Sequence, residues 1–215
     1  RRGALHARRP ARRRPRRGEG APRRPGRHGP PGWHGGAPGV WLPRGGKGPG
    51  LLIDWAAMEA EPREILVRAP NWAGDVVMAT PGLRALRAGF PRARISVALR
   101  AGLEPLLEGS PRVDELIVLR HDRAGLPARL REAAALRGRR FDLGLALPDS
   151  FSAALFLRVA GVRCAVGYAR NGRSFLLHRA LPLAGGSRGR VMLPREQHVL
   201  GLVGAVGARA LGTAL

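Results

Sequence analysis

The sequence predicts an α/β protein in which residues 58–207 form a doubly wound parallel sheet. From residue 58 onward, short apolar runs alternate with segments whose apolar residues recur at helical spacing. The connections between these segments are short, and repeated strand–helix units with short connections imply parallel strands joined by right-handed crossovers. The chain of 215 residues, 44% of them hydrophobic, is long enough to bury a core. The predicted domain is therefore Rossmann-like.

The first strand–helix unit begins this pattern. The apolar run at 65–67 is typical of a fully buried parallel strand, and a polar loop follows at 71–75. Helical spacing then predicts a helix over 76–88, which contains Pro81. Because proline is tolerated best in the first turn of a helix, the alternative is a new helix with Thr80 as its N-cap and Pro81 as its first residue.

The remaining units follow in the same alternation. Further strands are predicted at 94–99, 115–119, 141–147 and 165–168. Helices are predicted at 103–107, 126–137, 153–159 and 195–206. The stretch between residues 169 and 194 shows no regular period, so no element is predicted there.

Composition excludes several classes of protein. No window approaches 18 uninterrupted apolar residues, so no membrane-spanning helix is predicted, and the arginine-rich start lacks the apolar segment of a secretory signal. The single Cys164 excludes an intrachain disulfide framework, and a small buried side chain is expected there. The dinucleotide fingerprint, the P-loop and the Gly-x-Ser-x-Gly elbow are absent. A reducing, cytoplasmic setting is expected.

The net charge of +23 divides between two unlike regions. Residues 1–57 carry +12 and are rich in arginine, glycine and proline, so they are predicted to form a disordered arm. Three interpretations of this arm stay open: a solvated native extension, an arm that binds nucleic acid, or sequence that is not native coding sequence. The third rests on Met58, the first methionine, and on a composition in which Lys47 is the one lysine.

Two polar loops follow predicted strands at the edge where ligands bind in open α/β sheets, namely 71–75 and 148–152. Asp75 lies at a predicted helix start, where a carboxylate either performs chemistry or accepts hydrogen bonds from free backbone N–H groups. His121, His178 and His198 lack the spacing of metal ligands, so surface or loop positions are expected for them.

The loop at 71–75 belongs to a longer stretch, residues 65–81, that reads Ile-Leu-Val-Arg-Ala-Pro-Asn-Trp-Ala-Gly-Asp-Val-Val-Met-Ala-Thr-Pro. This stretch resembles the opening strand, loop and helix of glycosyltransferase family 9, the ADP-heptose:lipopolysaccharide heptosyltransferases. Other pieces agree with the family in order and spacing, and the resemblance covers residues 62–207. These pieces lie at 105–115, 141–154, 160–162 and 166–168, and more loosely at 195–198.

The resemblance implies the amino-terminal, acceptor-side half of a GT-B glycosyltransferase. It implies an inverting transfer of L-glycero-D-manno-heptose from ADP-heptose to the heptose of the lipopolysaccharide inner core, with Asp75 as the base. Neither a metal nor a cofactor is implied. The candidate substrate-binding residues are Asn71, Gly74, Asp149, Ser150, Arg100 and Arg170. Arg68, Arg120 and Arg173 are further candidates for the phosphates of the lipid A–core acceptor.

The resemblance also carries expectations about the rest of the protein. Donor binding in the family is mainly the task of a carboxyl-terminal domain, so residues 208–215 are expected to begin a linker to such a domain, and this chain is expected to be a fragment that is inactive alone. Peripheral contact with the inner face of the inner membrane is expected, where +11 on residues 58–215 favours anionic lipid. The alternative is a basic protein that binds nucleic acid through residues 1–57.

Overall fold

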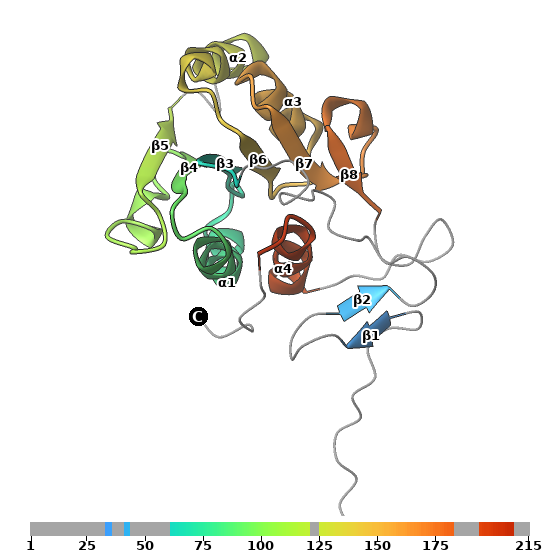
Figure 1. Cartoon of the computed structure of the whole chain (residues 1–215). Coiled ribbons are helices and arrows are strands. Elements are labelled where there is room, and N and C mark those ends of the chain that lie inside the picture. Colours follow the sequence, from blue (N-terminus) through green and yellow to red (C-terminus); the bar gives the residue numbers. More distant parts are fainter. Residues whose placement is uncertain (1–32, 36–40, 44–60, 121–124, 183–193, 209–215) are drawn as a thin grey trace, which may run out of the picture.

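The computed structural model describes residues 33–35, 41–43, 61–120, 125–182 and 194–208. Among them, a six-stranded sheet forms the centre of the molecule (Figure 1). All five strand pairings in this sheet are parallel. Its strands are β3 (Glu64–Arg68), β4 (Arg94–Arg100), β5 (Glu115–Leu119), β6 (Leu143–Ala146), β7 (Cys164–Tyr168) and β8 (Arg179–Leu181).

The strand order is β5-β4-β3-β6-β7-β8, which makes the sheet doubly wound as predicted. Strands β3 to β5 extend the sheet in one direction and β6 to β8 extend it in the other. The order reverses between β3 and β6, which are paired in register from Ile65 with Leu143 to Arg68 with Ala146. In such sheets the crevice at the carboxyl ends of the two central strands is the usual ligand site. Both predicted polar loops start there.

Four helices cover the two faces of this sheet. In Figure 1, α1 and α4 lie on one face, and α2 and α3 lie on the other. Each face has its own apolar core, and the central strands contribute alternate residues to both, such as Ile65 and Val67 to one and Leu66 to the other. The helices are α1 (Ala73–Gly89), α2 (Leu126–Ala135), α3 (Phe151–Val159) and α4 (Arg195–Ala205).

Helix α1 runs through Pro81 without a break. The alternative of a new helix that begins at Thr80 is therefore wrong. Pro81 has no N–H to donate to the carbonyl of Val77, four residues earlier. The hydroxyl of Thr80 donates to that carbonyl instead, at 2.8 Å, and so supplies the missing hydrogen bond.

Helices α1 and α4 pack closely because small residues of α1 face α4 and the residues just after it. A Cβ atom added at Gly82 would lie 2.3 Å from Val199 Cγ1 of α4, and one added at Gly89 would lie 2.6 Å from the Cα of Ala208. Neither position has room for a side chain. The glycines thus allow the close approach of α4 to α1.

Among the departures from the predicted elements, two concern the sheet and the segment after β4. Strand β8 was not predicted, because its three residues are too few to show a period. The predicted helix at 103–107 is a single turn of 3-10 helix, Glu104–Leu106. None of the helices in the described ranges is both long and apolar enough to cross a membrane.

Most of the predicted arm, together with His121 and residues 209–215, lies outside the described residues. Within residues 1–57 the structure describes two short strands, β1 (Trp33–Gly35) and β2 (Trp41–Pro43), which pair antiparallel. This pairing was not predicted. The disorder expected for the rest of the arm stays a prediction.

Candidate functional site

The first loop of the site leaves the carboxyl end of β3 and enters α1. Arg68, the last residue of β3, is 5% exposed, and its guanidinium donates to the carbonyl of Ala69 at 2.5 Å and to Asn71 Oδ1 at 2.7 Å. Hydrogen bonds from the buried Arg68 thus stabilise the start of this loop. Trp72, the N-cap residue of α1, stays 74% exposed, and its side chain makes no capping hydrogen bond.

Asp75 lies in the first turn of α1, where the positive end of the helix dipole favours a carboxylate. Its side chain is 24% exposed, and its Oδ1 forms an ion pair with Arg195 Nε at 3.5 Å. In the described part of the chain, neither oxygen of this carboxylate accepts a hydrogen bond from a side chain or from a backbone N–H. The described residues therefore do not support the alternative in which Asp75 accepts hydrogen bonds from backbone N–H groups.

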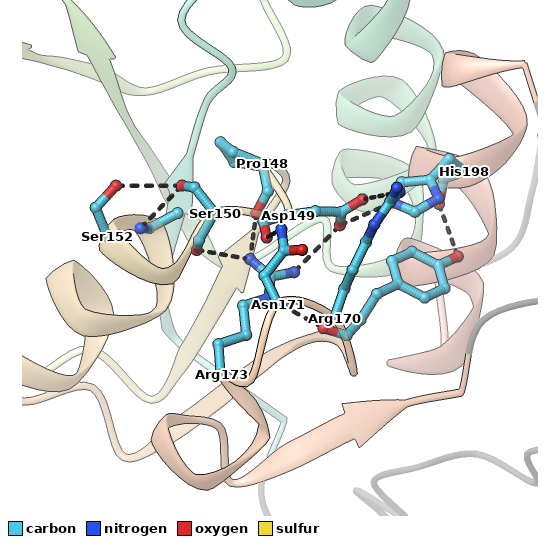
Figure 2. Close-up of polar contacts among 10 residues, drawn as sticks. Pro148, Asp149, Ser150, Ser152, Arg170, Asn171, Arg173 and His198 are labelled. Atoms are coloured by element: carbon cyan, nitrogen blue, oxygen red, sulfur yellow. Dashed lines mark hydrogen bonds and ion pairs between the residues drawn. The ribbon is translucent and has the colours of Figure 1, made fainter. Parts of the chain in front are cut away.

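The second loop joins β6 to α3 and contains Asp149. Figure 2 shows its carboxylate among cationic side chains from two later segments. Oδ1 lies 3.2 Å from Arg173 Nη2 and 3.1 Å from His198 Nε2, and Oδ2 lies 3.4 Å from Arg170 Nη1. Because an ionised carboxylate only accepts, His198 donates through Nε2. Both oxygens of Asp149 are therefore occupied.

Charge keeps Asp149 ionised despite its burial. Burial alone would raise the pKa of this carboxyl, whose side chain is 13% exposed. The hydrogen bond from His198 and the charges of His198, Arg173 and Arg170 outweigh that cost, so the pKa of Asp149 lies below its ordinary value.

Arg173 clamps the turn that carries Asp149. Its side chain is wholly buried, and Nε donates to the carbonyl of Tyr168 at 3.0 Å. Nη1 donates to the carbonyls of Pro148 and Ser150, the latter at 3.1 Å (Figure 2). Burial lowers the pKa of Arg173, while the charge of Asp149 opposes that effect. Arg173 therefore binds its own chain and is not exposed to the phosphates of a substrate, which corrects its place among the predicted phosphate-binding residues.

His198 is buried, contrary to the surface or loop position expected from the sequence. It lies in α4, is 8% exposed, and stacks against the ring of Tyr168 with 3.9 Å between the centroids. The hydroxyl of Tyr168 donates to the backbone carbonyl of His198 at 2.8 Å. Burial, together with the nearby charge of Asp149, raises the pKa of Tyr168, so its hydroxyl keeps its proton and serves as a donor.

The other predicted site residues lie at the same edge of the sheet but in different surroundings. Ser150 caps α3 by accepting from the N–H of Ala153 at 3.2 Å, so its side chain has a structural partner. Gly74 is exposed, and no atom would obstruct a side chain there, so close packing does not require a glycine. Arg100 ends β4, and Arg170 is half exposed beside Asp149.

Two residues of the site, Arg195 and His198, were not among the predicted site residues. The signals available were their place at the start of the last predicted helix and the loose resemblance to the family at 195–198. Asn171 was also missed. Its backbone is left-handed with φ of 52°, and its amide donates to the carbonyl of Asp149 at 2.9 Å.

A small open pocket adjoins the first loop on the side of the sheet covered by α2 and α3. Its polar atoms come from Arg68, Arg129, Glu132 and Ser152, and its apolar wall comes from Leu119, Leu126, Leu130 and Phe156. Guanidinium groups and the carboxylate of Glu132 lie together in this pocket, so its lining carries both signs of charge. Within the described ranges, no three His, Cys, Asp or Glu residues gather as a set of metal ligands.

Similarity to known proteins agrees with this architecture. The chain is 36% identical over 119 residues to lipopolysaccharide heptosyltransferase 2 of Salmonella typhimurium, and equally identical over 117 residues to that of Escherichia coli K12. Each match covers 54% of this chain and 34% of the relative. The chain is thus similar to heptosyltransferases over part of their length. No protein-family model matches it.

Solved structures of heptosyltransferases share the fold. ADP-heptose lipopolysaccharide heptosyltransferase II of E. coli superposes with a TM-score of 0.53 at 27% identity, over 71% of this chain and 46% of that one. An E. coli heptosyltransferase solved with ADP gives a TM-score of 0.58 at 17% identity, over 70% of this chain and 49% of that one. The predicted fold, a Rossmann-like half of a GT-B glycosyltransferase, is confirmed. This chain spans about one third of the length of the curated relatives it matches.

Proposed function

We propose that this chain is the acceptor-side part of a heptosyltransferase that transfers heptose from ADP-heptose to the heptose of the lipopolysaccharide inner core. Its similarity to heptosyltransferase 2 proteins and the doubly wound sheet support this function. The observation that carries it is Asp75, a partly exposed carboxylate at the switch point of the sheet that accepts no hydrogen bond from the described residues.

Asp75, and not Asp149, fits the role of general base. A base must reach the proton that it abstracts with an unoccupied oxygen, at about 2.6–3.2 Å from the reacting hydroxyl. Asp149 is enclosed by His198, Arg173 and Arg170, which engage both of its oxygens. The carboxylate of Asp75 is partly exposed and accepts no hydrogen bond from the described residues.

The proposed step is a single displacement with inversion. The hydroxyl of the acceptor sugar gives its proton to Asp75 Oδ2, and its oxygen forms a bond to the anomeric carbon of the donor heptose. The bond between that carbon and the phosphate oxygen breaks, and ADP leaves with the electron pair. Protonated Asp75 then releases its proton to solvent. The proposed step involves neither a cofactor nor a metal ion.

The acceptor is proposed to lie against the pocket beside β3. This pocket combines guanidinium groups, the carboxylate of Glu132 and an apolar wall, so it offers both polar and apolar contacts to a core sugar. Asn71, Gly74 and Arg100 at the same edge remain proposed contacts, together with Arg170. The protein is proposed to work in the cytoplasm at the inner face of the inner membrane, where its basic surface favours anionic lipid.

Kinetics with the complete product of the gene that encodes this sequence test the proposal. The assay follows ADP release with ADP-heptose and a core acceptor that ends in heptose. We expect Asp75→Asn to lower kcat by about 10²–10⁴-fold, the usual contribution of a general base, with acceptor binding retained. Glu108→Gln, which removes an exposed carboxylate elsewhere, is the control and should leave kcat unchanged. Activity of Asp75→Asn near that of the wild type would reject the base, and a wild-type protein without transfer would reject the function.

A further inference from the structure

One turn of one helix holds both carboxylates of the switch point. Arg195, the first residue of α4, pairs with Asp75, and His198, three residues later, hydrogen-bonds to Asp149. Residues three apart in a helix lie on the same face, about 5–6 Å apart at Cβ. The first turn of α4 thus contacts the loop after β3 through one side chain and the loop after β6 through the other.

We propose that Arg195 is the positioning residue of Asp75, and that α4 sets the arrangement of the site by holding Asp75 through Arg195 and Asp149 through His198. The inference rests on the proposed function, because the position of Asp75 matters for catalysis only if Asp75 is the base. It adds a residue and an element that the sequence did not indicate.

The ion pair has the geometry that a positioned base requires. Arg195 Nε lies 3.5 Å from Asp75 Oδ1, and no hydrogen bond joins these two side chains. An ion pair of this kind favours one orientation of the carboxylate and leaves its lone pairs for the proton of an acceptor hydroxyl. The side chains of Asp75 and Arg195 are 24% and 34% exposed, so the pair lies at the surface that substrates would cover.

Contacts with α1 and β7 hold α4 in place. The missing side chain at Gly82 lets α1 approach Val199 in the second turn of α4. The hydroxyl of Tyr168 fixes the backbone of α4 at His198, and a Cβ atom at Gly201 would lie 2.6 Å from that hydroxyl. These contacts come from α1 and β7, so the placement of α4 depends on the same sheet that carries the two loops.

Two variants of Arg195 and a matched control test the proposal. Arg195→Gln removes the charge, Arg195→Lys keeps it, and Arg92→Gln removes an arginine from an exposed ion pair with Glu61. In the complete gene product, we expect Arg195→Gln to lower kcat at least tenfold while KM for donor and acceptor stays within twofold, because misplaced groups lose rate without losing binding. Arg195→Lys should recover part of the loss, and Arg92→Gln should have no effect.

A second measurement on the 215-residue chain does not depend on activity. Side-chain couplings measured by NMR report the χ1 rotamers of Asp75. We expect one dominant rotamer in the wild type and in Arg92→Gln, and averaging over rotamers in Arg195→Gln. Unchanged melting temperature in Arg195→Gln would show that the fold is kept.

The outcomes separate the two proposals. An unchanged kcat in Arg195→Gln, in an enzyme that Asp75→Asn inactivates, would overturn the positioning role alone. A rise in the donor KM with kcat held would also overturn it and would assign Arg195 to the phosphates of ADP-heptose. If Asp75→Asn itself stays active, the proposed base fails, and an ordered Asp75 in Arg195→Gln would then overturn the positioning role independently.

Discussion

His198 Nε2 lies 3.1 Å from Asp149 Oδ1, although 49 residues separate them in the chain. The contact joins α4 to the turn between β6 and α3, and the stacking of His198 on Tyr168 connects it to β7. Three segments that are distant in sequence therefore meet at one buried carboxylate. The stability of the fold and the geometry of the candidate site are linked at this point.

Replacement of Arg173 should destabilise the fold strongly. Arg173→Leu would leave Asp149 and the carbonyls of Pro148, Ser150 and Tyr168 without their shared donor. Removal of one partner from a buried ion pair costs about 3–5 kcal/mol. The measurement is the free energy of unfolding in urea.

Arg170→Leu is the matched control, because Arg170 pairs with the same carboxylate from a half-exposed position. Exposed ion pairs contribute about 0–1 kcal/mol, so this variant should stay within about 1 kcal/mol of the wild type. Equal losses in the two variants would contradict the role of Arg173 as a buried clamp.

The unfolding free energy should depend on pH through Glu115. Hydrogen bonds from Arg139, opposed by partial burial and helped by Arg94 and Ser96, lower the pKa of Glu115 from 4.5 to about 2. Since the folded-state pKa lies below the unfolded value, ionised Glu115 stabilises the fold fully above about pH 4.5. This contribution is lost as the pH falls from about 4.5 towards 2.

Glu115→Gln should therefore flatten the decline in stability between about pH 4.5 and 2. Unfolding in urea at several pH values measures this slope. Glu61→Gln, which changes an exposed carboxylate, serves as the comparison. A slope in Glu115→Gln as steep as that of the wild type would show that other carboxyl groups cause the decline.

Two glycines of α4 should respond oppositely to the same substitution. Gly201→Ala would place a methyl group 2.6 Å from the hydroxyl of Tyr168, and crowding of a well-packed core costs about 1–3 kcal/mol. Gly204→Ala has open space at its Cβ, so the higher helix propensity of alanine should stabilise the protein by about 0.5–1 kcal/mol. Thermal unfolding of both variants measures the difference, and a stabilised Gly201→Ala would be the contrary result.

The hydroxyl of Thr80 should matter only while Pro81 is present. Thr80→Val removes the donor to the carbonyl of Val77, whose usual helical donor is missing at Pro81. We expect a loss of about 0.5–1.5 kcal/mol in the wild type. In Pro81→Ala the backbone N–H is restored, so the same substitution should cost less there. Additive effects in this double-mutant cycle would contradict the compensation.

The predicted and observed sites agree for residues that directly follow a predicted strand. Asp75 and Asp149 both lie at the switch point, because the apolar runs before them form the two central strands of the sheet. Ser150 was placed at the right edge, but its side chain caps α3. The sequence does not distinguish an exposed polar side chain from one that caps a helix, since both occur at the same position of the same loop.

Local sequence encodes the alternation of strands and helices, the parallel sheet and the two loops at its carboxyl edge, because these features depend on the period of apolar residues. Tertiary packing is needed to bury Arg173 and His198, to add β8 to the sheet and to bring Arg195 to Asp75. Those contacts join segments far apart in the chain, and they form only when α4 packs against α1 and brings its first turn to the edge of the sheet.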